Sequence, residues 1–171
     1  MFKRFYPDEM VDKVTDIDFQ GMYDNGYRGV IFDIDNTLVE HGMPATEANK
    51  KFFAELKEIG LKVMFLSNNK EPRVKSFRDA VNYGDYIYKA GKPNPANYFE
   101  AMKRMGTDED NTFFAGDQLF TDVWGGKKAG IKTFLVKPID KKEEIQIVLK
   151  RILEKPVLWF YKRSKRKNNK K

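Results

Sequence analysis

Short apolar runs alternate with amphipathic stretches along most of this chain. The apolar runs are predicted to form strands, at 29–35, 62–67, 86–88, 112–116 and 131–136. The stretches between them are predicted to form helices, at 46–59, 72–81, 95–105, 122–129 and 141–153. Strands that alternate with helices predict an α/β fold. We therefore expect a Rossmann-like three-layer sandwich, with a mostly parallel sheet covered on both faces.

The two ends of the chain give a weaker pattern. The first 25 residues or so are expected to form an extended segment and a short helix packed on the sheet. The last predicted helix carries four apolar residues on one face, Ile145, Val148, Leu149 and Ile152. We expect this face to pack on the domain and close it. We expect one domain at 1–155, followed by an aromatic and basic C-terminal tail at 156–171.

The composition permits one domain and excludes several kinds of site. With 171 residues, 41% of them hydrophobic, the chain can bury a full core. No apolar run approaches the ~20 residues that a transmembrane helix needs, and we expect a cytoplasmic protein. The absence of cysteine excludes disulfides and thiolate ligands. The single histidine, His41, excludes a histidine-rich metal cluster, and we expect it at the surface.

The positive charge is concentrated at the C-terminus. The net charge is +7, and residues 162–171 hold seven basic residues and no acidic one. Without these seven, 25 basic residues face 25 acidic ones, so the body of the protein is formally neutral. A nucleic-acid-binding fold would carry its basic patch on the domain, so we do not expect nucleic acid as a partner.

Polar side chains follow the predicted strands, and those after the first strand are the most informative. Asp33 and Asp35 point to the same side where that strand ends. Two carboxylates this close repel each other unless a cation or a shared proton intervenes. Such a pair indicates Mg²⁺ and phosphate chemistry, although it also fits an ordinary polar turn.

Three later strands also end in residues that can handle phosphate. Ser67 and Asn68 follow the second strand, Lys92 follows the third, and Asp117 and Asp122 follow the fourth. Taken singly, each has a structural explanation, as a helix cap or a loop lysine. The carboxyl ends of parallel strands meet at one edge of a sheet, so we expect all of them in one crevice.

This ordered set resembles the haloacid dehalogenase (HAD) superfamily of phosphohydrolases. Its four motifs match Asp33-x-Asp35-x-Thr37, then Ser67, then Lys92, then Gly116-Asp117 with Asp122. The resemblance implies that Asp33 is the nucleophile that forms an aspartyl-phosphate. It also implies that Asp35 protonates the leaving oxygen and then deprotonates the attacking water.

The resemblance also implies a division of labour among the matched residues. We expect Mg²⁺ to be held by the Asp33 and Asp117 carboxylates and the Asp35 carbonyl, although Mn²⁺ would suit the same oxygen donors. Phosphate contacts are expected from Thr37, Ser67, Asn68 and Lys92, with Asp122 in support. Only one helix separates each motif from the next between Asp35 and Lys92, so there is no room for a cap domain.

A closer resemblance is to the YqeG-like capless phosphatases, which are similar to mitochondrial phosphatidylglycerophosphate phosphatase. It rests on 31–39, 67–69, 89–93 and 116–123, and also on Tyr6-Pro7 and 26–29 before the first strand. It implies dephosphorylation of a lipid headgroup, from phosphatidylglycerophosphate to phosphatidylglycerol. The alternatives are a nucleotide, a sugar phosphate or a phosphoprotein as substrate, or an RNA- or ribosome-associated binding module.

The tail fits the lipid substrate. The segment 156–161 places aromatic rings beside the basic run, a combination typical of the interface of an anionic membrane. We therefore predict peripheral contact with the inner face of the cell membrane. A disordered solubilising tail, with Trp159 and Phe160 packed on the domain, is the alternative. The oligomeric state is left open.

Overall fold

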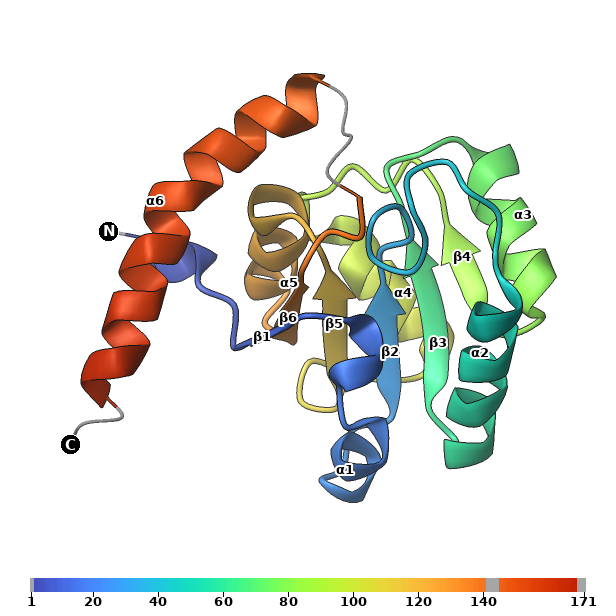
Figure 1. The fold of residues 1–171 in the computed structure, drawn as a ribbon. Coiled ribbons are helices and arrows are strands. Elements are labelled where there is room, and N and C mark those ends of the chain that lie inside the picture. The colour runs from blue at the N-terminus through green and yellow to red at the C-terminus, as the bar shows by residue number, and fades with distance from the viewer. Residues whose placement is uncertain (1, 141–144, 169–171) are drawn as a thin grey trace.

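Six parallel strands form a single sheet in the computed structural model, which describes residues 2–140 and 145–168 (Figure 1). In spatial order they are β1 (Glu9–Val11), β6 (Lys132–Val136), β5 (Thr112–Gly116), β2 (Gly29–Phe32), β3 (Lys62–Leu66) and β4 (Asp85–Ile87). Each strand runs parallel to its neighbours. The predicted α/β fold is confirmed. Because the strand order reverses at β2, the carboxyl ends of β2 and β5 border a crevice.

Helices cover both faces of the sheet. One face packs on α1 (Phe19–Asp24), α2 (Glu47–Ile59) and α3 (Glu71–Val81). The other packs on α4 (Ala96–Met105) and α5 (Trp124–Lys128), and α6 (Ile145–Asn168) runs along the outside of that layer (Figure 1). The three layers agree with the predicted sandwich.

Strand β2 shows why the core strands read as continuous apolar runs. Its residues alternate between the two faces. Phe32 meets Phe53 of α2 edge-on, with ring centroids 5.5 Å apart, whereas Ile31 belongs to the opposite cluster with Tyr98 of α4. Since both faces are buried, neither can be polar.

The N-terminal segment adds an edge strand to the sheet. The expected extended segment is β1, which pairs with β6, and the expected short helix is α1. The predicted helix at 122–129 is divided into a π-helical turn, η3 (Leu119–Val123), and α5. In that turn the Val123 amide donates to the Gln118 carbonyl, five residues earlier, over 3.2 Å.

Two expectations about the last helix are wrong. Helix α6 does not end at Leu153 but continues through Pro156 to Asn168, while its predicted start at Lys141 lies outside the described residues. The apolar face that was expected to pack on the domain is exposed, and the opposite face is buried. The reason is that Val157, on the buried face, packs against an apolar surface formed by Phe5 and by residues of η3 and β6.

The fold leaves the crevice without a cap. All residues between Asp35 and Lys92 are described, and they hold only α2, β3, α3 and β4. Within the described part of the chain, no helix is both long enough and apolar enough to cross a bilayer.

Candidate active site

The predicted site residues gather at the carboxyl edge of the sheet. A cleft of about 410 Å³ lies there. Of the predicted residues, it is lined by Asp33, Asp35, Ser67, Asn68 and Lys92. Parallel strands deliver them to this edge, since Asp33 follows β2 and Ser67 follows β3. His41, expected only to be at the surface, also contributes to the wall.

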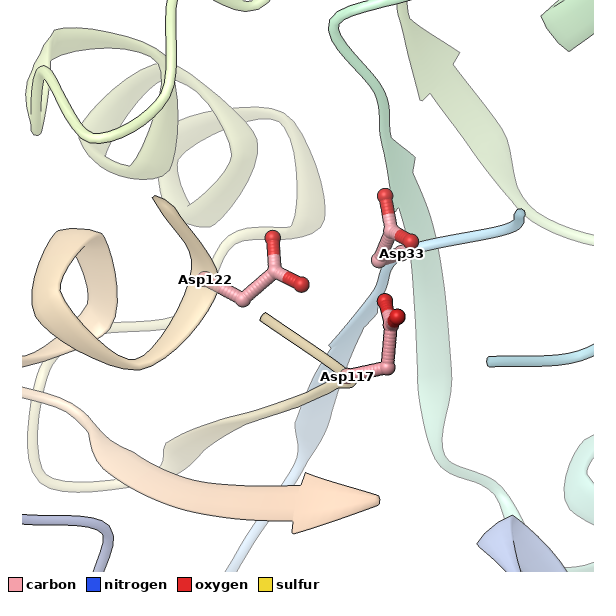
Figure 2. Close-up of side chains that lie close together, drawn as sticks. All are labelled: Asp33, Asp117 and Asp122. Carbon is pink, nitrogen blue, oxygen red and sulfur yellow. The ribbon is translucent and has the colours of Figure 1, made fainter. Parts of the chain in front are cut away.

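Three buried carboxylates lie together beside this cleft. Asp33, Asp117 and Asp122 come from the end of β2, the end of β5 and η3, and their side chains lie close together (Figure 2). One carboxylate oxygen of each residue lies within 4.8 Å of one carboxylate oxygen of each of the other two. Such a group of anions in a buried site requires positive charge close by.

Lys92 supplies part of that charge. Its Nζ lies 2.7 Å from Asp33 Oδ1 and 2.7 Å from Asp122 Oδ1. Burial alone would lower the pKa of Lys92, but the two carboxylates raise it above its ordinary value, so the amine stays charged. Asp122 is fixed further by the Gln118 amide, which donates to Oδ2 over 3.0 Å. Asp122 therefore positions Lys92 against Asp33.

Burial and mutual repulsion raise the pKa values of two of the acids. Burial, opposed by Lys92, raises the pKa of Asp33 to about 6. Burial together with the charges of Asp33 and Asp122 raises the pKa of Asp117 well above its usual range. A bound cation would favour the ionised forms of both, so the site is suited to one.

Three polar residues predicted to bind phosphate, Thr37, Ser67 and Asn68, differ in their hydrogen-bond partners and in whether they line the cleft. The Thr37 hydroxyl lies between carboxylates, 3.2 Å from Asp117 Oδ1, and Thr37 does not line the cleft. The Asn68 side chain is bonded to the backbone of Lys92, accepting from its amide over 2.8 Å. The Ser67 Oγ accepts from the Asn69 amide over 3.2 Å at the cleft wall.

The Asp35 carboxylate is separate from the three-acid group. It accepts hydrogen bonds from the Gly42 amide and Arg73, both at 2.8 Å, and from Asn69 at 3.3 Å. Burial acts to raise the pKa of Asp35, but Gly42 and Arg73 lower it below its usual value. Arg73 was not predicted as a site residue. It lies in the first turn of α3, the helix that follows Ser67, and this position could have indicated that it reaches the site.

A second unpredicted arginine reaches the site from α6. The Arg151 guanidinium forms an ion pair with Asp117, and Arg151 also contacts Glu154 at 3.2 Å. The buried Glu154 carboxylate accepts from the Leu119 amide over 2.7 Å. Nothing in the sequence marked these residues, because they lie more than 30 positions from Asp117 and no motif includes them.

The donor set of the three-acid group fits a hard divalent cation. All three side chains offer carboxylate oxygens, which Mg²⁺ and similar ions prefer. All three acids already accept hydrogen bonds, from Lys92, Gln118, Thr37 or Arg151, so a bound ion would have to replace some of these contacts. The Asp35 carboxylate lies outside this group.

The comparisons with known proteins agree with this chemistry. The family described as HAD-hydrolase-like matches residues 89–145. The chain is 38% identical over 165 residues, 95% of each protein, to "Probable phosphatase YqeG" of Bacillus subtilis. It is 27% identical over 158 residues to "Phosphatidylglycerophosphate phosphatase 1, chloroplastic/mitochondrial" of Arabidopsis thaliana, covering 83% of this chain and 43% of that protein.

A solved structure supports the fold alone. The cobalt-bound deoxy-D-mannose-octulosonate 8-phosphate phosphatase of Haemophilus influenzae superposes with a TM-score of 0.54. It is 16% identical and covers 65% of this chain and 68% of its own. At this identity the likeness reports only the arrangement of strands and helices.

Proposed function

The chain belongs to the HAD-like phosphatases, in the family of YqeG, and within that class we propose that it dephosphorylates phosphatidylglycerophosphate to phosphatidylglycerol. The observation that carries this proposal is the uncapped cleft beside the buried Asp33, Asp117 and Asp122 group. An open site admits a headgroup that remains attached to a bilayer. The similarity to the Arabidopsis enzyme over 83% of this chain supports the lipid substrate.

The proposed reaction runs in two steps through the cleft. Asp33 attacks the phosphorus, an aspartyl-phosphate forms, and the ester oxygen leaves with a proton from Asp35. Asp35 then takes a proton from water, which attacks the phosphorus and releases inorganic phosphate and free Asp33. Because Gly42 and Arg73 lower the pKa of Asp35 and favour its ionised form, the carboxylate must first leave Arg73 and take up a proton from solvent, which it then gives to the leaving oxygen.

Charge neutralisation is the main demand of this reaction, because a phosphate dianion must approach a carboxylate. Lys92 is fixed for that purpose by Asp122. Asp33, Asp117 and the Asp35 carbonyl would hold Mg²⁺, which supplies Lewis-acid stabilisation of the phosphoryl oxygens when bound. Ser67 is proposed to donate to the same oxygens, and Thr37 and Asn68 to fix the groups around them.

The proposed substrate places the enzyme at a membrane surface. We expect a cytoplasmic protein that contacts the inner face of the cell membrane peripherally. The basic C-terminal end, with Lys162, Arg163, Lys165 and Arg166 exposed, is proposed to make that contact.

Phosphate release from phosphatidylglycerophosphate in mixed micelles with Mg²⁺ tests the proposal. The comparison panel holds a nucleoside monophosphate, a sugar phosphate and a phosphoserine peptide, which represent the alternative substrates. The Asp33→Asn variant, matched in shape, is the control. We expect release from the lipid to exceed that from the panel, and Asp33→Asn to lose at least about 10³-fold.

Each other result has a definite meaning. Release from a soluble ester alone would keep the Asp33 mechanism and reject the lipid substrate. Wild-type rates in Asp33→Asn would reject the mechanism. Salt-sensitive RNA binding without any hydrolysis would favour the RNA-associated module instead.

A further inference from the structure

Helix α6 exposes a continuous apolar face. Its inner side buries Glu154, Val157 and Tyr161 against the domain. The opposite side holds what we term the outer stripe: Ile145, Val148, Leu149, Ile152, Leu153, Trp159 and Phe160. These side chains are between 39% and 78% exposed. At 3.6 residues per turn, these positions fall on one side of the helix. At the end of this stripe the Phe160 ring also stacks on Phe2, with centroids 5.6 Å apart.

The outer stripe is too extended to be a scatter of surface residues. Single exposed apolar residues are ordinary, whereas a contiguous patch marks an interaction site. From Ile145 to Phe160 the stripe covers about 22 Å of helix at 1.5 Å per residue. Figure 1 shows one side of α6 facing the domain and the other side facing away from it.

The charges beside the stripe indicate what covers it. Lys155, Lys162 and Arg166 are exposed and spaced by seven and four residues, so they follow one edge of the stripe. Among the described residues of α6 the sole acid is Glu154, which is buried and bonded to the Leu119 amide. The outward surface therefore presents apolar and cationic groups without carboxylates.

We infer that the outer stripe and its basic edge dock this enzyme on an anionic bilayer. Apolar side chains enter the boundary between headgroups and acyl chains, and lysine and arginine pair with lipid phosphates. Trp159 and Phe160 suit the same interfacial depth. The functional reason for docking rests on the proposed lipid substrate. The position of the docking surface rests on the exposed side chains of α6.

The stripe begins at the rim of the active-site cleft. Ile147, between Ile145 and Val148, lines that cleft, and Arg151 of the same helix contacts Asp117. A bilayer that covers α6 would therefore lie next to the cleft opening. A phosphorylated headgroup could then reach Asp33 while its acyl chains stay in the membrane.

Flotation of the full chain with vesicles tests the docking surface. Vesicles of phosphatidylcholine alone are compared with vesicles containing about 30% phosphatidylglycerol, an anionic lipid. The test variant is Leu149→Gln with Ile152→Gln. The matched control is Phe99→Gln, which replaces an exposed apolar side chain on α4.

We expect binding to the anionic vesicles only, with the control unchanged and the stripe variant weaker by at least about tenfold. Unchanged binding of the stripe variant, or equal binding to both kinds of vesicle, would overturn the inference. The inference would also be overturned if the wild type formed a dimer that the stripe variant does not form, and neither protein bound vesicles. The stripe would then bind a second copy of the chain.

Hydrolysis of p-nitrophenyl phosphate separates this inference from the proposed function. All variants should retain it, because the altered residues lie outside the site, and this confirms that they fold. Vesicle binding without release of phosphate from the lipid would reject the substrate and keep the docking surface. Lipid hydrolysis in micelles without vesicle binding would do the reverse.

Discussion

The ammonium of Lys92 lies 2.7 Å from both Asp33 and Asp122, and all three side chains are buried. Replacing it with methionine leaves two buried carboxylates without that partner. Removing one member of a buried ion pair costs about 3–5 kcal/mol. We expect Lys92→Met to lower the free energy of unfolding by about this amount at pH 7, measured by urea denaturation.

Added Mg²⁺ should recover part of that loss, because a cation bound to the native state replaces some of the missing positive charge. The exposed lysine variant Lys51→Met is the control and should stay within about 0.5 kcal/mol of the wild type. If Lys92→Met were as stable as Lys51→Met, the ion pairs with Asp33 and Asp122 would contribute nothing to folding.

Asp35 and Asp117 should separate in their effects, although both belong to predicted motifs. Asp117 offers a carboxylate to the three-acid group, whereas the Asp35 carboxylate lies outside it. The metal contact proposed for Asp35 is its backbone carbonyl, which asparagine retains. We therefore expect Asp117→Asn to weaken Mg²⁺ binding strongly by calorimetry. Asp35→Asn should keep the Mg²⁺ affinity and lose about 10²–10⁴-fold in turnover, the usual contribution of a general acid. Equal loss of metal affinity in both variants would contradict these positions.

Among the elements, β1 is attached by its pairing with β6 and by Asp8, the residue that precedes it. Asp8 forms an ion pair with Lys127 of α5 and accepts from the amide and hydroxyl of Thr133 in β6, at 2.8 Å and 3.0 Å. Burial acts to raise the pKa of Asp8, but Lys127 and Thr133 lower it below the usual 3.8. The stabilisation is therefore complete above pH 3.8 and is lost as the pH falls through the lowered value.

We expect Asp8→Asn to cost about 1 kcal/mol at pH 7, a modest value because a third of the Asp8 side chain is exposed to screening solvent. Urea denaturation between pH 7 and pH 2.5 measures the difference between the two proteins. It should shrink as the acid limit is approached, since Asp8 then becomes neutral in the wild type too. A difference that stays constant with pH would assign the effect to lost packing.

The elements around the site could be predicted because each leaves a local signal. An apolar run such as Val30–Phe32, followed by Asp33 and Asp35, specifies both a buried strand and its carboxyl end. The elements that failed lack such a signal. Helix α6 has apolar residues on both sides. Periodicity therefore could not decide which side packs against the domain, where Val157 contacts the apolar cluster. The contact of Arg151 with Asp117 depends on that same choice.

At the scale of the whole molecule, charge is divided between two regions. The body carries 25 basic and 25 acidic residues, while residues 162–171 carry the net positive charge. The catalytic groups, by contrast, are buried: Asp33 and Lys92 pair inside the fold. Salt screens exposed charges much more than buried ones. Attachment to an anionic surface and catalysis should therefore respond differently to ionic strength.

Raising NaCl from about 0.1 M to about 1 M shortens the Debye length from about 10 Å to about 3 Å. We expect phosphate release from the lipid substrate in anionic vesicles to fall at least about tenfold, since each basic residue near such a surface contributes about 1 kcal/mol. Hydrolysis of p-nitrophenyl phosphate should change less than about twofold, because the buried ion pairs are screened little. The Lys155→Gln, Lys162→Gln variant should show a shallower salt dependence on vesicles and none on the soluble ester. A parallel fall for both substrates would mean that salt acts on the cleft itself, and the basic edge of α6 would then have no part in presenting the substrate.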